Sequence, residues 1–204
     1  VGTISTDTTG KATIETKAAK RQPTIQDLLR HTSGITYGGR GVTEIHKLWP
    51  MSSSWSSMNF TGAEFTEKIG KLPLLNEPGA VWDYSLSTDV LGLVVESVSG
   101  KPLASFLAER IWIPLGMTDT SFNVPEAKQG RYARAFANDP LTGKPQTVLH
   151  ASGKPLKFDC GGGCAVSTVL DYLRFSQMLL NGGTLDGKRY LKPESVKERA
   201  AVSL

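Results

Sequence analysis

Apolar residues recur at the spacing of a helix in the middle of the chain. The longest such run lies between Ser87 and Gly100, and its apolar positions are Val90, Leu91, Val94, Val95 and Val98. Ser85 and Ser87 both favour the N-cap of a helix, while Gly100, with Pro102 just beyond it, is a typical helix end. The pattern predicts an apolar helix that begins at one of these serines and ends at Gly100.

Further helices are predicted from capping residues, prolines and glycines. Their expected bounds are Thr24 to Gly34, Thr61 to Lys71, Pro102 to Pro114, Thr168 to Asn181, and a last helix from Pro193. Thr24 and Thr61 each stand three residues before an acidic residue, which is the pattern of a capped N-terminus. The apolar residues expected to face inward are Ile25, Leu28 and Leu29 in the first helix, Leu103, Phe106, Leu107 and Ile111 in the third, and Leu170, Leu173, Met178 and Leu179 in the fourth.

Strands are predicted in three places. Turn residues around Thr8 to Lys11 predict a short hairpin or a surface loop, and Asp186-Gly187 predicts a small hairpin. Between Arg131 and Phe158, an alternating pattern, a turn from Asp139 to Gly143 and the triplet Thr147-Val148-Leu149 predict further β structure. His150 lies in this stretch and carries no functional prediction.

The segment from Tyr37 to Phe60 is rich in Gly, Ser, Trp and Met and has neither a helical nor a strand period. We expect an irregular loop here. Long loops in compact domains are often functional, so one hypothesis makes it a flap over a substrate cleft, with Trp49, Trp55 or Met58 contacting the substrate. The alternative is a surface loop that is held in place by its own aromatic side chains.

Tyr84 stands between a predicted turn and the start of the apolar helix. Pro78-Gly79 reverses the chain just before Trp82, so the segment that carries Tyr84 is constrained on both sides. The unpaired N–H groups of a helix N-terminus carry partial positive charge, which would stabilise a phenolate. These positions make Tyr84 a candidate general base. The alternative is a tyrosine that packs and bonds its hydroxyl to a backbone carbonyl.

Cys160 and Cys164 flank three glycines. The glycines permit the close approach that a disulfide needs, but the ring would be small and its geometry demanding, so two thiols are the expectation. A metal site is disfavoured because no histidine lies nearby in the sequence. The glycine run could let backbone approach a ligand, although it lacks the lysine and hydroxyl of a phosphate-binding loop.

Composition excludes several classes of protein. With 204 residues, 39% of them hydrophobic, the chain can bury a core as one domain or as two closely packed lobes. The net charge of +4 arises from basic residues scattered among acidic ones, which indicates a solvated surface and no nucleic-acid partner. No segment reaches about 18 consecutive apolar residues, so no membrane span is expected.

Three separated phrases resemble one enzyme family. They are Thr24 to Ile35 (TIQDLLRHTSGI), Pro78 to Gly92 continued by Ser99-Gly100 and Pro114 to Met117, and Ala165 to Gly183 (AVSTVLDYLRFSQMLLNGG). In this order and at these distances they resemble the serine β-lactamase-related hydrolases, which include class C β-lactamases, D-Ala-D-Ala carboxypeptidases and family VIII carboxylesterases. The resemblance covers most of the chain.

The resemblance implies a fold and one catalytic residue. The fold is α+β and β-lactamase/transpeptidase-like, with this chain forming mostly its helical region plus short β segments. In the family the tyrosine that opens a Tyr-x-Asn motif is the proposed general base, and Tyr84 occupies that place. The third motif position is Leu86 instead of Asn, which favours esters over β-lactam amides as substrates. The same comparison favours a structural role for His31, since this hydrolase class does not use a Ser-His-Asp triad.

The motif that should supply the nucleophile is missing. No serine has a lysine three positions later, and no Lys-Thr-Gly or His-x-Gly motif is found. By the family's order these motifs lie before Val1 and after Leu204, so we expect residues 1–204 to be one incomplete domain that lacks its nucleophile and C-terminal strand regions. A signal peptide could precede Val1, so the cytoplasm and the periplasm both remain open.

The sequence therefore predicts a serine hydrolase of ester, or alternatively amide or β-lactam, bonds. Tyr84 is its predicted general base, and Trp49, Trp55, Met58 and Leu86 are its predicted substrate contacts. No cofactor and no metal are expected, and the partners are a small-molecule substrate and the remaining segments of the same enzyme. The alternative is a catalytically inactive binding or scaffold module that keeps the fold without the nucleophile.

Overall fold

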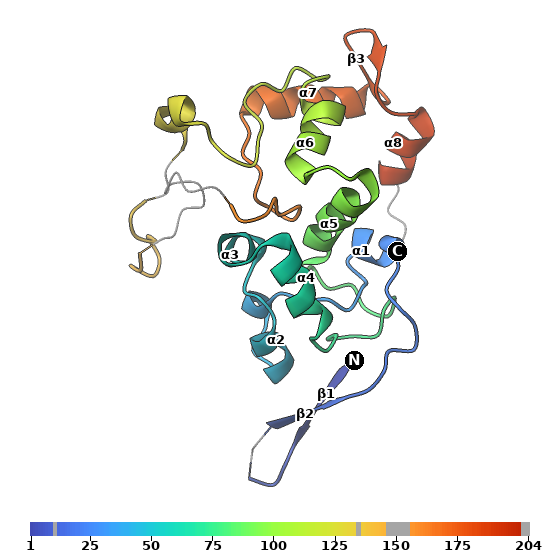
Figure 1. The fold of residues 1–204 in the computed structure, drawn as a ribbon, viewed down its shortest axis with the longest axis vertical. Helices are drawn as coiled ribbons and strands as arrows, with labels where there is room; N and C mark the ends of the chain where they lie inside the picture. The colour runs from blue at the N-terminus through green and yellow to red at the C-terminus, as the bar shows by residue number, and fades with distance from the viewer. Residues whose placement is uncertain (10–11, 134–135, 146–155, 201–204) are drawn as a thin grey trace. The chain divides into compact units, whose positions relative to one another are not determined.

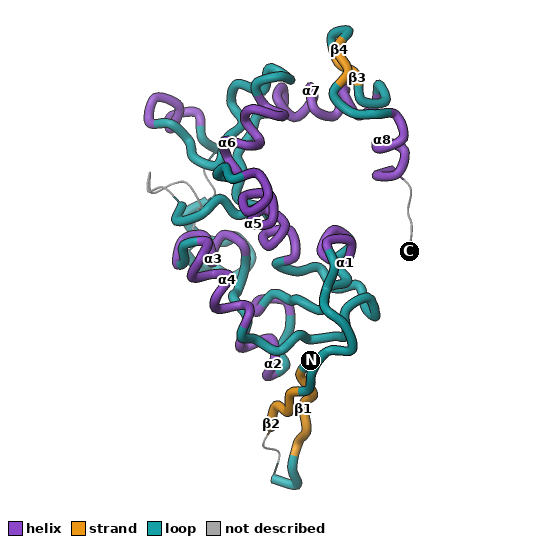
Figure 2. The backbone as a smooth tube through the Cα atoms, turned by 45° about the vertical axis from the view of Figure 1, so that its right-hand side comes forward, coloured by secondary structure: helices purple, strands orange, loops and turns teal. Residues whose placement is uncertain are grey.

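The computed structural model describes residues 1–9, 12–133, 136–145 and 156–200. Within these ranges it is an α+β structure in which helices predominate over two short hairpins (Figures 1 and 2). The elements are β1 (Gly2–Thr6), β2 (Ala12–Thr16), α1 (Ile25–Leu29), α2 (Glu44–Leu48), α3 (Ser53–Asn59), α4 (Gly62–Gly70), α5 (Ser87–Ser99), α6 (Leu103–Leu107), α7 (Val169–Leu180), β3 (Thr184–Leu185), β4 (Lys188–Arg189) and α8 (Pro193–Ala200). Short 3-10 helices cover Gly38–Arg40 and Glu126–Arg131, and a π-helical segment covers Ala108–Trp112.

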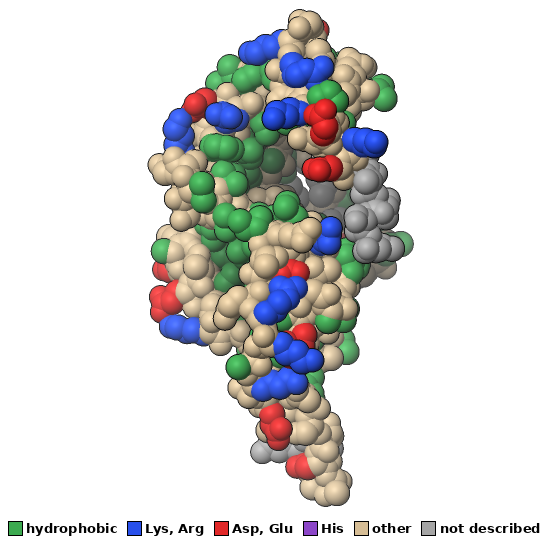
Figure 3. All heavy atoms as spheres, turned by 90° about the vertical axis from the view of Figure 1, so that its right-hand side faces the viewer, with side chains coloured by type: hydrophobic (Ala, Val, Ile, Leu, Met, Phe, Trp, Pro, Cys, Tyr) green, Lys and Arg blue, Asp and Glu red, His purple; other side chains and the backbone are tan. Residues whose placement is uncertain are grey.

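The chain forms two compact units, each with its own interior. The first contains residues 1–103 and 123–165, and the second contains residues 104–122 and 166–204. No single described helix is long and apolar enough to cross a membrane; α5 and Leu103–Trp112 meet that test of length and composition only when taken together. On the face in Figure 3, lysine and arginine side chains are interspersed with acidic ones.

The N-terminal hairpin forms as predicted. Strands β1 and β2 pair antiparallel, with Gly2 opposite Thr16 and Thr6 opposite Ala12. Asp7 begins the connection, and its carboxylate accepts the backbone N–H of Thr9. Such an Asx turn stabilises a tight reversal of the chain.

Helix α1 is capped as its sequence predicts, but it is short. The Thr24 hydroxyl accepts the N–H of Asp27, and the Asp27 carboxylate accepts the N–H of Thr24, which completes a capping box. Arg21 donates two hydrogen bonds to Asp27 and holds the pKa of that carboxyl well below its usual value. The helix has only five residues, and Leu28 is its one buried apolar residue, so the prediction that Ile25 and Leu29 face inward is wrong.

The segment from Tyr37 to Phe60 is not the irregular loop that the sequence predicts. It contains α2 and α3, and each begins at a hydroxyl residue that caps it. The Thr43 side chain accepts the N–H of His46, and the Ser52 side chain accepts the N–H of Trp55. Both helices are too short to show an apolar period, so the capping hydroxyls were the only local signal of their presence.

Helices α4 and α5 complete the helical part of the first unit. Thr61 and Glu64 form the predicted capping box of α4, and α5 ends at Gly100, which has a φ of +68°. The core between them includes Phe65, which is fully buried and stacks on Phe158 with ring centres 5.1 Å apart. Neither Ser85 nor Ser87 caps α5 with its side chain, so that prediction is wrong: Leu86 occupies the N-cap position.

The second unit is built around α7. Thr168 caps this helix as predicted, and Asp171 in its first turn accepts the backbone N–H of Asp119 at 2.7 Å. Met178 is buried, whereas Leu170 and Leu173 are exposed, so the inward face predicted for them is wrong. The other core residues are Trp112, Leu115, Met117, Phe122 and Leu185.

The end of the second unit follows its prediction. Asp186-Gly187 turns the β3–β4 hairpin, and Pro193 begins α8. The Tyr190 hydroxyl donates to the Pro114 carbonyl at 2.7 Å and attaches the hairpin to the segment before Leu115.

The β structure predicted between Arg131 and Phe158 is largely absent from the described part of that stretch. Those residues contain the end of a 3-10 helix and one antiparallel bridge, between Asn138 and Pro145 around the predicted turn. Thr147-Val148-Leu149 and His150 lie outside the described residues.

Candidate active site

Backbone hydrogen bonds fix the segment that carries Tyr84. The predicted turn is present, and Gly79 at its corner has a φ of +85°. The Gly79 N–H donates to the Thr32 carbonyl at 2.7 Å, and the Asp83 N–H donates to the His31 carbonyl at 2.8 Å. The residues after α1 are therefore hydrogen-bonded to the segment before Tyr84, and these bonds fix the position of that segment.

His31 supports Tyr84 from the side. Its imidazole lies with its ring centre 4.7 Å from that of Tyr84, and its Nδ1 accepts the N–H of Ser85 at 3.1 Å. Burial lowers the pKa of His31, so the imidazole is neutral at pH 7, and the bond to Nδ1 leaves its proton on Nε2, which faces Thr88. The structural role predicted for His31 agrees with these contacts, although it holds the Tyr84 segment and the start of α5, not the end of its own helix.

Tyr84 lies at the edge of a pocket of about 320 Å³. The pocket is lined by Tyr37, Gly39, Arg40, Met51, Ser52, Ser53, Ser54, Tyr84, Gly162 and Gly163. The Tyr84 side chain is 40% exposed, and its hydroxyl makes no hydrogen bond with another described residue. A pocket of this size suits a small-molecule substrate, and Tyr84 is one of its lining residues.

A second tyrosine in the pocket differs in its environment. Tyr37 has its ring centre 5.7 Å from that of Tyr84, but it is 7% exposed and its hydroxyl bonds to Ser53 Oγ at 2.9 Å. Burial raises the pKa of Tyr37 to about 12, so Tyr37 is a neutral phenol at physiological pH. Of the two, Tyr84 is the one whose hydroxyl makes no hydrogen bond with another described residue.

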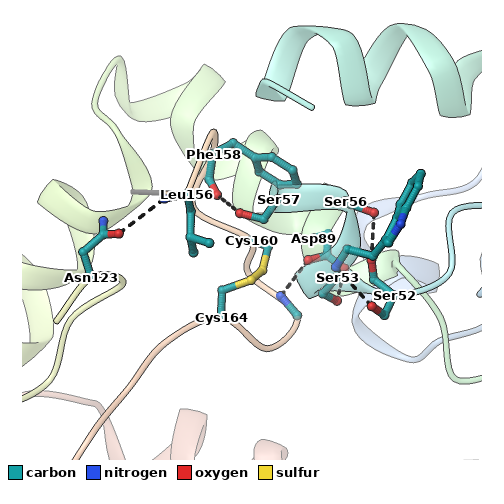
Figure 4. The surroundings of a disulfide bond; sticks show 12 residues. Ser52, Ser53, Ser56, Ser57, Asp89, Asn123, Leu156, Phe158, Cys160 and Cys164 are labelled. Carbon is teal, nitrogen blue, oxygen red and sulfur yellow. Dashed lines mark hydrogen bonds between the residues drawn. A yellow bond between two sulfur atoms is a disulfide. The ribbon is translucent and has the colours of Figure 1, made fainter. Parts of the chain in front are cut away.

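A buried carboxylate ties two walls of the pocket together. Asp89, in the first turn of α5, has no exposed surface; it accepts Ser53 Oγ at 2.7 Å and the Gly162 N–H at 3.0 Å (Figure 4). Burial raises the pKa of Asp89, because the interior disfavours its charged form. The bonds connect Asp89 to the start of α3 on one side and to the glycine loop on the other.

The glycine loop is closed by a disulfide between Cys160 and Cys164, and both cysteines are buried (Figure 4). The expectation of two thiols is therefore wrong: the intervening glycines bring the two cysteines within bonding distance. Gly162 and Gly163 line the pocket, so the loop brings backbone to a site where a ligand could bind. No cluster of three potential metal ligands occurs among the residues that the structure describes.

Comparison with known proteins identifies the family. The sequence model of the Beta-lactamase family matches residues 2–202. This chain belongs to the Beta-lactamase family. The resemblance and the α+β fold that the sequence predicts are thereby confirmed.

One of the individual relatives is named an esterase. The chain is 38% identical to Protein Rv1367c of Mycobacterium tuberculosis over 89% of this chain and 45% of that protein. It is 34% identical to esterase EstB of Burkholderia gladioli, over 70% of this chain and 35% of EstB. A LovD6 mutant of simvastatin synthase from Aspergillus terreus matches with a TM-score of 0.69 and 26% identity, over 96% of this chain and 45% of that structure. The chain thus spans less than half the length of each.

Of the site residues predicted for this Beta-lactamase-family chain, Tyr84 is the one that lines the pocket. Trp49 and Leu86 are buried: the Trp49 indole N–H donates to the Pro73 carbonyl at 3.0 Å, and Leu86 is fully enclosed. Trp55 and Met58 are partly exposed, and neither lines the pocket beside Tyr84. A substrate contact by Trp55 or Met58 stays a prediction.

Four pocket residues were not anticipated from the sequence. They are Tyr37, Arg40 and Ser53, which line the pocket, and Asp89, which lies behind it. The signal for Asp89 was an acidic residue among apolar ones in the first turn of a helix, where a carboxylate is also expected for dipole reasons alone. The other three lie in the segment from Tyr37 to Phe60, which one hypothesis placed over a substrate cleft, but no local pattern singled them out.

The contact between the glycine loop and Asp89 predicts different effects for two adjacent glycines. A Cβ at Gly162 would lie 2.6 Å from both Asp89 Oδ2 and Ser53 Oγ, whereas a Cβ at Gly163 would meet nothing within 4 Å. We expect Gly162→Ala to lower the free energy of unfolding by about 1–3 kcal/mol, the usual range for overpacking. Gly163→Ala is the control and should change it by less than about 0.5 kcal/mol. Equal midpoints of urea unfolding for the two variants would contradict the packing at Gly162.

Proposed function

We propose that the protein containing this chain is a serine hydrolase of ester bonds that works through an acyl-serine intermediate. The observation that carries the proposal is the position of Tyr84, which lines the pocket of a Beta-lactamase-family fold, is 40% exposed and makes no hydrogen bond through its hydroxyl to another described residue. EstB, one of the relatives, is named an esterase. The Ser-Lys pair that the mechanism needs is assigned to residues outside this chain.

Tyr84 acts in this proposal as the group that moves the proton. In its phenolate form Tyr84 accepts the serine proton and becomes a phenol, while the serine Oγ attacks the ester carbonyl and the new C–O bond forms. When the tetrahedral intermediate collapses, the bond to the alcohol breaks and Tyr84 donates that proton to the leaving oxygen. Water then attacks the acyl-serine, gives a proton to Tyr84, and the serine takes it back as the acid is released.

Two features support ester over amide substrates. Leu86 stands where the family motif has an amide-recognising Asn, and its side chain has no exposed surface. This position therefore offers no hydrogen bond to a substrate amide. Alcohols are also better leaving groups than amines, so a site that offers no side-chain hydrogen bond to a substrate amide is better suited to esters.

Labelling with a fluorophosphonate tests this proposal. The full-length protein should gain the mass of one phosphonyl group, because such probes modify activated serines, and a heat-denatured sample is the control. Peptide mapping should place the adduct on a serine outside residues 1–204. No adduct would favour a catalytically inactive module, and an adduct on Ser52, Ser53 or Ser54 would overturn the assignment of the nucleophile to another segment.

A further inference from the structure

One charged side chain lines the pocket within the described part of the chain. Arg40 ends the short 3-10 helix Gly38–Arg40 and is exposed, and its guanidinium carbon lies 5.4 Å from the centre of the Tyr84 ring. The other lining residues are neutral: two tyrosines, a methionine, serines and glycines. The pocket therefore presents a single positive charge next to the residue that the proposed mechanism uses.

The N–H groups of the Arg40 guanidinium make no hydrogen bond within the described structure. No carboxylate in that part of the chain lies within ion-pair distance of its guanidinium, in contrast to Arg21 and Arg174, which pair with Asp27 and Asp186. A guanidinium over an aromatic ring makes that contact with its face, and the N–H groups on its edge stay available. These N–H groups match the two oxygens of a carboxylate.

We propose that Arg40 is an anion-binding residue of the pocket and that the preferred substrates are esters carrying a carboxylate a few bonds from the scissile bond. This inference rests on the proposed function and names its substrate class. Because Arg40 lies over the Tyr84 ring, an anion bound to it stays close to the oxygen that exchanges the proton. The carboxylate can belong to the acyl part or to the alcohol part of the ester. In both cases its two oxygens accept hydrogen bonds from the Arg40 guanidinium.

Two matched pairs of esters test the proposal with the full-length protein. For the acyl part, mono-4-nitrophenyl adipate is compared with its neutral carboxamide, 4-nitrophenyl adipamate. For the alcohol part, 4-acetoxybenzoate is compared with 4-acetoxybenzamide. In at least one pair kcat/KM should be about tenfold higher for the anionic ester, since a charge-assisted hydrogen bond at an exposed site contributes at the lower end of its range. The preference should shrink as salt concentration rises.

Variants assign the preference to Arg40. In Arg40→Gln the ratio of kcat/KM between anionic and neutral ester should fall to about one. In Arg40→Lys the ratio should lie between one and the wild-type value, because the charge is kept and the bidentate hydrogen-bond geometry is lost. Arg30→Gln is the control: it removes the same charge from the end of α1, from a residue that does not line the pocket, and should keep the wild-type ratio.

Three outcomes would overturn the inference. The first is a wild-type protein that hydrolyses all four esters without preferring either anion. The second is a preference that Arg40→Gln retains. The third is an equal loss for both members of each pair in Arg40→Gln, which would place the effect of Arg40 on Tyr84 instead of on the substrate. Absence of turnover with every ester, by contrast, would overturn the proposed function itself.

Discussion

Replacing Tyr84 with phenylalanine is expected to lower kcat/KM for short 4-nitrophenyl esters by about 10² to 10⁴, the range for loss of a general acid–base group. The substitution removes only the hydroxyl. The ring keeps its contacts with His31, Tyr37 and Arg40, and no described residue loses a hydrogen bond. The free energy of unfolding should therefore change little while activity falls.

Tyr172→Phe is the matched control for this experiment. Tyr172 lies on α7, is 63% exposed, and does not line the pocket. Its loss of a hydroxyl should leave both kcat/KM and the urea midpoint at wild-type values. If Tyr84→Phe retained turnover within about twofold of wild type, Tyr84 would have no part in proton transfer.

The second large effect is expected at Asp89. In Asp89→Ala the buried Ser53 hydroxyl loses its acceptor, the N–H of half-buried Gly162 loses its partner, and a small cavity opens. An unsatisfied buried donor costs about 1–3 kcal/mol and the cavity adds to this, so the free energy of unfolding should fall by roughly 3 kcal/mol. Urea unfolding of the full-length protein measures this change. A loss below about 1 kcal/mol would mean that Asp89 does not hold the pocket walls together.

Asp89→Asn separates the shape of this residue from its charge. Burial raises the pKa of Asp89 in the folded protein above its ordinary value of 3.8, so the folded state binds this proton more tightly than the unfolded state. That contribution to stability is complete below about pH 3.8 and is lost as pH rises through the folded-state pKa. Asparagine has no such proton, so the stability of the variant relative to wild type should increase from pH 4 to pH 7. A difference that stays constant over this range would show that Asp89 titrates normally.

At the start of α5, the local rules for helix capping did not predict which groups the serine hydroxyls bond to. Ser85 and Ser87 have the composition of N-cap residues, yet the structure uses their hydroxyls in a buried chain. Ser87 Oγ bonds to Ser85 Oγ at 2.7 Å and to Ser33 Oγ at 2.8 Å. A hydroxyl can satisfy either a helix end or a neighbouring side chain, and Ser33 is 54 residues away from Ser87, so only the folded arrangement decides between them.

The predicted inward faces failed for a related reason. Helical periodicity predicts which apolar residues share a face, but not whether other residues cover that face. Leu28 and Met178 are buried, whereas Ile25, Leu29, Leu170 and Leu173 from the same helices are exposed in this chain. Burial depends on partners from distant parts of the sequence, and the pattern of one helix contains no information about them.

The sequence by itself determined the features whose physics is local. The hydroxyls of Thr24, Thr61 and Thr168 cap helices because the donors that they satisfy lie within the next turn, and the turn at Pro78-Gly79 follows from the backbone preferences of those two residues. Together with the family phrases, these rules placed Tyr84 between a turn and a helix. Only the tertiary structure decided what surrounds it. The pocket combines Tyr37, Tyr84 and Gly162, which are far apart in sequence, and Asp89 behind it bonds to Gly162. These contacts depend on side-chain packing and on burial of a carboxylate, neither of which a single stretch of residues can specify.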